Sequence, residues 1–151
     1  MTDPTVLGPD EGEAMTARGS VITFKATGAT TGGAFSLMDR TLPPSGRMPP
    51  SHTHQGEEAF YILEGEVVVQ VGDRSVRAIP GTFVLVPPEQ PHTFGNASDT
   101  RARLLILHRP AADEYFRELA RLWAATTPPT RDAERALMRR HGITPASGTS
   151  G

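Results

Sequence analysis

The residues most able to do chemistry in this chain are three histidines and a glutamate near its middle. His52 and His54 are two positions apart, so on an extended strand their side chains leave the same face, and Glu58 keeps that parity. His92 can supply a further donor from another part of the fold. Imidazole nitrogens and a carboxylate oxygen that converge in this way predict one divalent transition metal per chain, whose identity (Fe, Mn, Ni, Co or Zn) the donor set leaves open.

Glu58 is also the candidate catalytic residue. A metal of this kind acidifies a bound hydroxyl group, and a carboxylate that is free of the metal can take the proton as a general base. Glu57 competes with Glu58 as a ligand, but strand alternation turns its side chain away from His54. We therefore expect Glu57 to be a solvated neighbour.

The same parity argument predicts an apolar substrate pocket beside the metal. Phe60 and Ile62 share the parity of Glu58. Phe94 shares the parity of His92. A largely apolar pocket with one cation suits a small organic ligand that carries an enol, phenol or carboxylate oxygen. Such a small-molecule substrate is the partner that we expect.

The segments around these residues read as short β-strands. Residues rich in Val, Ile, Phe and Tyr recur between turn signals at Glu64-Gly65, Gly72-Asp73 and Pro80-Gly81. The predicted strands are 20–27, 33–40, 59–63, 66–71, 75–79, 82–86 and 103–108. Short strands at this spacing favour an all-β, antiparallel sandwich or barrel.

Two motifs built on these residues resemble those of the cupin family. The first has the pattern G-x5-H-x-H-x3-E-x6-G, at Gly46, His52, His54, Glu58 and Gly65. The second has the pattern G-x5-P-x-G-x2-H-x3-N, at Gly81, Pro87, His92 and Asn96, with Glu89 where the family has glycine. Over about residues 20 to 108 the chain is similar to the small single-domain cupins of the quercetin 2,3-dioxygenase type. The resemblance implies a jelly-roll barrel, or double-stranded β-helix, with the four ligands named above.

We expect one domain with extensions at both ends. The predicted parts are a flexible arm over 1–19, the barrel over 20–109, a helical extension over 110–142 and a disordered tail over 143–151. In the extension, short α-helices carry an aromatic stripe of Tyr115, Phe116 and Trp123, expected to pack on the barrel or on a second subunit. As in many relatives, a homodimer is expected.

Composition excludes several classes of protein. The net charge of −2 comes without a basic stripe, so neither nucleic acid nor an anionic membrane is an expected partner. The chain has no cysteine, which excludes disulfides and thiolate ligands. The sequence shows neither a membrane-spanning run nor a secretory signal, so we expect a cytoplasmic protein.

Three functions fit these residues. The first is a quercetinase-like dioxygenase, which the family resemblance favours. The second is a non-redox cyclase, isomerase or decarboxylase of polyketide-type secondary metabolism, and the third is a small-molecule-binding cupin without catalysis. Glu89 is a weaker candidate for acid–base chemistry, because exposed carboxylates are ordinary in turns. His108 and His141 lie outside the motifs, and no chemical role is predicted for them.

Overall fold

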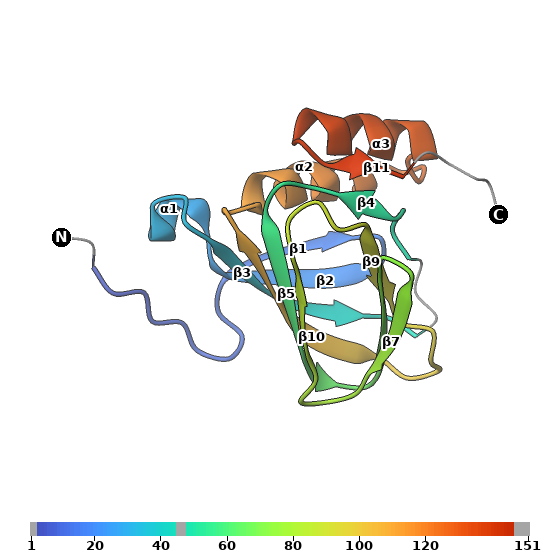
Figure 1. Ribbon diagram of the computed structural model, residues 1–151. Helices are drawn as coiled ribbons and strands as arrows, with labels where there is room; N and C mark the ends of the chain where they lie inside the picture. Colours follow the sequence, from blue (N-terminus) through green and yellow to red (C-terminus); the bar gives the residue numbers. More distant parts are fainter. Residues whose placement is uncertain (1–2, 45–47, 147–151) are drawn as a thin grey trace.

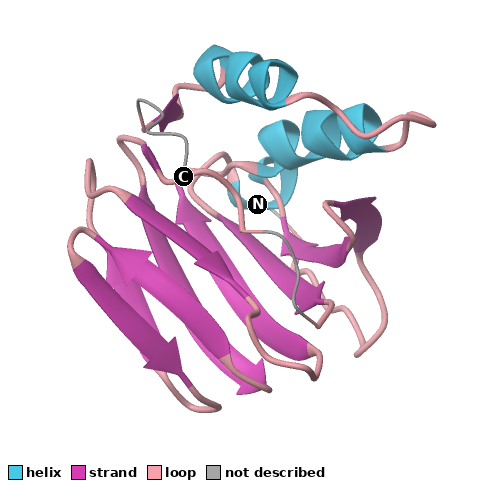
Figure 2. Cartoon of the chain, turned by 90° about the vertical axis from the view of Figure 1, so that its right-hand side faces the viewer, coloured by secondary structure: helices cyan, strands magenta, loops and turns pink. Residues whose placement is uncertain are grey.

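Two antiparallel β-sheets form the body of the protein, and the helices lie at one end of it (Figure 1 and Figure 2). The structure is a computed structural model that describes residues 3–44 and 48–146. The six-stranded sheet has the order β1 (Glu13–Ala17), β2 (Ser20–Ala26), β3 (Ser36–Leu42), β10 (Ala102–Arg109), β5 (Glu57–Glu64), β8 (Phe83–Val86). The five-stranded sheet has the order β11 (Thr144–Pro145), β4 (His52–Thr53), β9 (His92–Gly95), β6 (Val67–Val71), β7 (Arg74–Ala78).

The hydrophobic core lies between the two sheets. Along β10 every second residue from Ala102 is buried, which is the period that a half-buried strand requires. Phe60 from one sheet and Phe94 from the other pack with their ring centroids 5.1 Å apart. The predicted all-β antiparallel barrel is therefore confirmed, and the predicted strands agree with the observed ones within a few residues.

Both ends of the chain add strands that the sequence did not predict. Residues 13–17 of the expected flexible arm pair with β2 along their whole length, from Glu13 opposite Phe24 to Ala17 opposite Ser20. Thr144–Pro145, at the start of the expected disordered tail, pair with β4. The arm and tail predictions are wrong over these residues. β1 joins β2 through the two-residue turn Arg18–Gly19, which is not one of the strong hairpin signals. β11 pairs with the distant β4, and such pairing leaves little trace in a short sequence. Residues 1–2 and 147–151 lie outside the described part of the chain.

The helices cover one open end of the barrel. A four-residue helix, α1 (Gly28–Thr31), connects β2 to β3, and α2 (Asp113–Trp123) and α3 (Arg131–Arg140) form the predicted extension. Tyr115, Phe116 and Leu119 of α2 are buried against the barrel, so the aromatic stripe packs on the chain's own sheet. Within the described residues, every helix is too short or too polar to span a lipid bilayer.

An apolar surface remains on the outer face of β5 and β8. Tyr61 pairs with Phe83 across these two strands, and both side chains are exposed, as are Leu63 and Leu85. Neighbouring exposed apolar side chains on one face of a sheet are typical of a protein interface. We propose that this face, and not the stripe on α2, forms the expected homodimer.

If the protein forms this dimer, multi-angle light scattering should give a mass near twice the 16.2 kDa of the chain. Phe83→Glu should shift the mass to that of the monomer, because it buries an unpaired charge in the interface. Val21→Glu, at another exposed position of the same sheet, is the control and should leave the dimer intact. A wild-type mass of 16.2 kDa at high concentration contradicts the proposal.

Candidate metal centre

The four predicted ligands meet inside the barrel. His52 lies on β4 directly opposite His92 on β9, and Glu58 lies near the start of β5. The donor atoms of these three residues and of His54 all lie within 4.8 Å of one another. Oε2 of Glu58 is 3.1 Å from Nε2 of His54 and 2.7 Å from Nε2 of His92.

The backbone fixes which nitrogen of each imidazole faces the centre. Each ring uses its Nδ1 to donate a hydrogen bond to a main-chain carbonyl, because a carbonyl oxygen can only accept. The acceptors for His52, His54 and His92 are the carbonyls of Pro50, Gly56 and Gln90, at 2.8, 2.9 and 2.7 Å. In the neutral rings, Nε2 therefore carries a lone pair that points toward the other donors.

This donor set fits a divalent metal ion. Nε2 of His54 and Nε2 of His92 are only 3.2 Å apart, and in the neutral rings neither has a proton to share. Converging lone pairs beside a carboxylate repel one another unless a cation lies between them. Three nitrogen donors and one oxygen donor match Fe, Mn, Co, Ni and Zn equally well.

The charges of these groups also favour metal binding. Burial lowers the pKa of His52 to about 4, so this ring is neutral at pH 7. Burial would raise the pKa of Glu58, but His108, His54 and His92 hold the pKa of this carboxyl well below its usual range. Burial lowers the pKa of His54, but its hydrogen bond to Glu58, the negative charge of Glu58 and its hydrogen bond to Gly56 together outweigh burial, so the net shift of this pKa is upward. At neutral pH the site offers a neutral His52 and a charged Glu58, as a metal requires.

The second motif departs from the family pattern at Glu89 without loss of the turn. Glu89 adopts a φ of 66°, in the left-handed region that favours glycine. Its backbone N–H donates to the carbonyl of His54 at 2.9 Å, so the turn holds the chain beside the ligand. The Glu89 side chain is exposed at the cavity mouth. Of the first motif, Gly46 lies outside the described residues.

His108 lies at the site, although the sequence predicted no chemical role for it. It lies on β10 opposite Glu58 on β5, and its Nε2 is 3.1 Å from Oε1 of Glu58. Glu58 thus shows one oxygen to the ligand cluster and the other to His108. The sequence held a signal for this position, because His108 continues the alternation of Leu104 and Ile106, whose side chains face the barrel interior. His141, also without a predicted role, lines the cavity and contacts Glu118.

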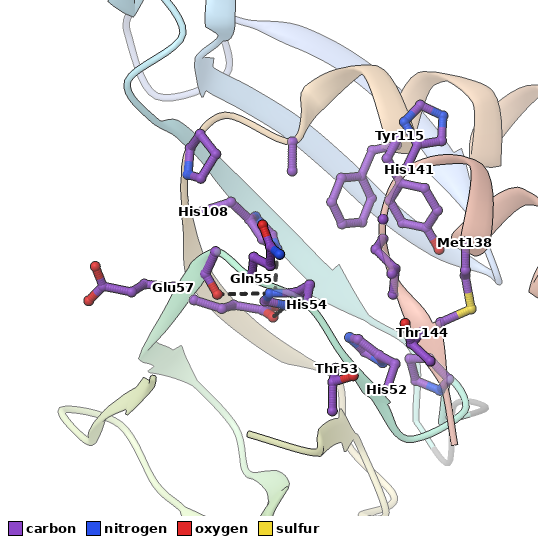
Figure 3. Close-up of a pocket in the computed structure, with 18 of the residues that line it drawn as sticks. His52, Thr53, His54, Gln55, Glu57, His108, Tyr115, Met138, His141 and Thr144 are labelled. Atoms are coloured by element: carbon purple, nitrogen blue, oxygen red, sulfur yellow. Dashed lines mark hydrogen bonds and ion pairs between the residues drawn. The ribbon is translucent and has the colours of Figure 1, made fainter. Parts of the chain in front are cut away.

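A cavity of about 850 Å³ opens beside the four donors, and part of its wall comes from the C-terminal helices (Figure 3). Phe94 lines it, as predicted. Phe60 and Ile62 do not, and this corrects the predicted pocket: both are fully buried. They do face the barrel interior, but beyond Glu58 that interior is filled by the packing of Phe60 on Phe94.

The cavity is therefore more polar than the sequence predicted. Besides the metal ligands its wall includes Arg18, Arg40, His108, Tyr115 and His141. None of these residues belongs to either motif: Arg40 and His108 lie on the six-stranded sheet, Arg18 lies in the turn before β2, and Tyr115 and His141 belong to the helical extension. Glu57, in contrast, turns outward and pairs with Arg109, which agrees with its predicted place outside the ligand set.

Comparisons with known proteins agree with this fold. Residues 38–108 match the cupin domain family. The HTH-type transcriptional regulator PuuR of Escherichia coli is 28% identical over 76 residues, which are 50% of this chain and 41% of the regulator. Quercetin 2,3-dioxygenase of Bacillus subtilis is 24% identical over 116 residues, 77% of this chain and 34% of that enzyme. The chain thus spans less than half the length of these curated relatives.

A solved structure extends the comparison to the fold. The polyketide cyclase RemF from Streptomyces resistomycificus superposes with a TM-score of 0.62 at 21% identity, over 71% of this chain and 80% of the cyclase. The match over residues 38–108 supports a small cupin, and the chain resembles the cupins of the quercetinase type. This resemblance concerns the fold and leaves the reaction open.

The donor geometry predicts what happens when one ligand is removed. His92→Ala should lower both the metal content and the melting temperature, because a bound metal stabilises only the folded state. Metal analysis of untagged protein by mass spectrometry, with a thermal melt of the same sample, measures both. Glu89→Ala is the control, and its metal content should equal that of the wild type. Full metal occupancy in His92→Ala refutes the ligand assignment.

Proposed function

We propose that the protein is a metal-dependent enzyme that removes a proton from a small enolisable or phenolic organic substrate. The observation that carries this proposal is the position of Glu58, which is buried between the metal donors and His108. It lies at the wall of a cavity large enough for an organic ligand. A binding protein has no need of a charged base at that place.

Glu58 is the proton acceptor in this proposal. When bound, a divalent metal on His52, His54, Glu58 and His92 would act as a Lewis acid and lower the pKa of a substrate hydroxyl. Oε2 of Glu58 faces the donor cluster and would take the proton once it has moved off the metal, while His108 stays hydrogen bonded to Oε1. His108 thus fixes the orientation of the Glu58 carboxyl group toward the donor cluster and stabilises its negative charge between turnovers.

The first candidate reaction is a quercetinase-like dioxygenation that uses O₂. The similarity to quercetin 2,3-dioxygenase over 77% of this chain supports it. The predicted apolar lining was a second argument, and the structure weakens it, because only Phe94 of the three named residues reaches the cavity.

The second candidate is a non-redox cyclase, isomerase or decarboxylase. Its specific support is the polar wall of the cavity, where His108 and Tyr115 can exchange protons with a substrate without any oxidant. The shared fold with a polyketide cyclase is compatible with this reaction. Both candidates need the same proton transfer to Glu58, and they differ only in the use of dioxygen.

The proton transfer predicts a large loss of activity in Glu58→Gln. Turnover per bound metal should fall by about 10²- to 10⁴-fold, because glutamine cannot accept the proton. Initial rates on substrates found in a screen of flavonols and β-diketones, with metal content measured on the same samples, test this. Glu57→Gln is the matched control next to it in the chain and should keep the wild-type rate. An unchanged rate per bound metal in Glu58→Gln contradicts the proposal.

Dioxygen separates the two candidate reactions. We expect an oxygen electrode to record consumption in a fixed ratio to product, and product formation to stop in an anaerobic chamber. The native metal must be loaded in both experiments. Equal product formation without oxygen would rule out the dioxygenase and leave the cyclase type of reaction.

A further inference from the structure

Arg40 is a buried cation that pairs with no carboxylate of the described residues. It lies on β3, its side chain is 3% exposed, and it lines the same cavity as the metal donors. Its Nε donates to Oγ of Ser20 at 2.9 Å, and its Cζ lies 5.3 Å from the centre of the Phe94 ring. Among the described residues, its two terminal nitrogens have neither a hydrogen-bond partner nor an ion-pair partner.

The nearby carboxylates are engaged elsewhere. Glu134 of α3 accepts from Arg18 at 3.3 and 3.5 Å and from Trp123 at 2.6 Å. Glu58 is shared by the histidines of the metal centre and by His108. Arg40 therefore has no counter-ion of its own, and a buried charge without one is costly.

Arg40 nevertheless remains charged at neutral pH. Burial and the charge of Arg18 lower its pKa to about 9, which still leaves the guanidinium protonated at pH 7. Tyr115 stands in the same wall, and burial raises the pKa of its hydroxyl, which keeps its proton. The inner wall thus presents a free guanidinium fork and a phenol, both of which can donate to an anion.

We propose that this part of the cavity is a carboxylate subsite, in which the terminal nitrogens of Arg40 hold the acidic group of the substrate. The inference rests on the proposed function, since it names a second group of the same substrate. The substrate class is then a carboxylic acid with an enol or phenol oxygen at its other end. One free guanidinium offsets one negative charge, which favours a carboxylate over a phosphate dianion.

The strand geometry sets the length of this substrate. His92 and Phe94 are alternate residues on β9, so their side chains leave the strand about 7 Å apart. Because Arg40 lies over Phe94 and the metal donors lie at His92, the two polar ends of the ligand are separated by about one aromatic ring. A hydroxybenzoate has these dimensions.

Charges at the mouth set the direction of binding. Glu89 and Glu114 are exposed at the rim of the cavity, and Glu57 is paired with Arg109. The two unpaired rim carboxylates repel a second carboxylate, whereas Arg40 attracts it. The acidic end of the ligand should therefore lie in the interior.

Calorimetric titration of the protein with its metal bound, carried out under argon, tests the subsite apart from the reaction. The probes are 4-hydroxybenzoate and its neutral analogue 4-hydroxybenzamide, which differ only in the charge of one group. The wild type should bind the acid more tightly by about tenfold to a hundredfold, because a hydrogen bond to a charged group is worth that much. Arg40→Met should abolish this preference, and Arg101→Met, on the surface, should retain it.

The outcomes distinguish the carboxylate subsite at Arg40 from the proposed proton transfer to Glu58. Equal affinity for acid and amide in the wild type, or no binding of the acid at millimolar concentration, overturns the carboxylate subsite whether or not Arg40→Met folds. An acid preference that survives in Arg40→Met overturns it as well. A clear acid preference in a protein that fails the Glu58→Gln test leaves the subsite standing and rejects the proposed function.

Discussion

The repulsion among three imidazole lone pairs and one carboxylate is the constraint on which the rest of this structure depends. Main-chain carbonyls hold the Nδ1 protons of His52, His54 and His92, so the Nε2 atoms have to face one another. A divalent cation between the donors relieves that repulsion without breaking those hydrogen bonds. The cross-strand pairing of β4 with β9, the buried Glu58 and the turn at Glu89 all serve to keep these donors together.

The barrel and the helices that cover it place polar residues on one side of the metal centre and an apolar residue on the other. His108 fixes one oxygen of Glu58 from the neighbouring strand, and Phe94 closes the apolar side of the cavity. Tyr115 comes from α2, which the ion pair of Arg117 with Glu13 of β1 holds against the barrel. A substrate in this cavity would meet a general base at one end and a free cation, Arg40, at the other, an arrangement suited to orienting an acid for proton removal.

Local sequence patterns predict the parts of this protein that local physics determines. Strand alternation placed His52, His54 and Glu58 on one face and located most strands, because the period of a β-strand is a local property. Parity also placed Phe60 and Ile62 inside the barrel, but it could not show that the interior beyond Glu58 is packed solid. The contact of His108 with Glu58 and the place of Arg40 in the cavity depend on which distant strands pair, and the alternation along a single strand does not contain that information.

The central claim is that three imidazoles and one carboxylate oxygen bind one metal ion. An X-ray absorption spectrum at the edge of the metal carried by untagged protein tests it most directly, since it identifies the atoms around the ion. The account predicts only nitrogen and oxygen neighbours, with the outer scattering pattern of three imidazole rings, and the loss of one ring in His52→Ala. A spectrum without imidazole scattering, or one that is unchanged in His52→Ala, would contradict it.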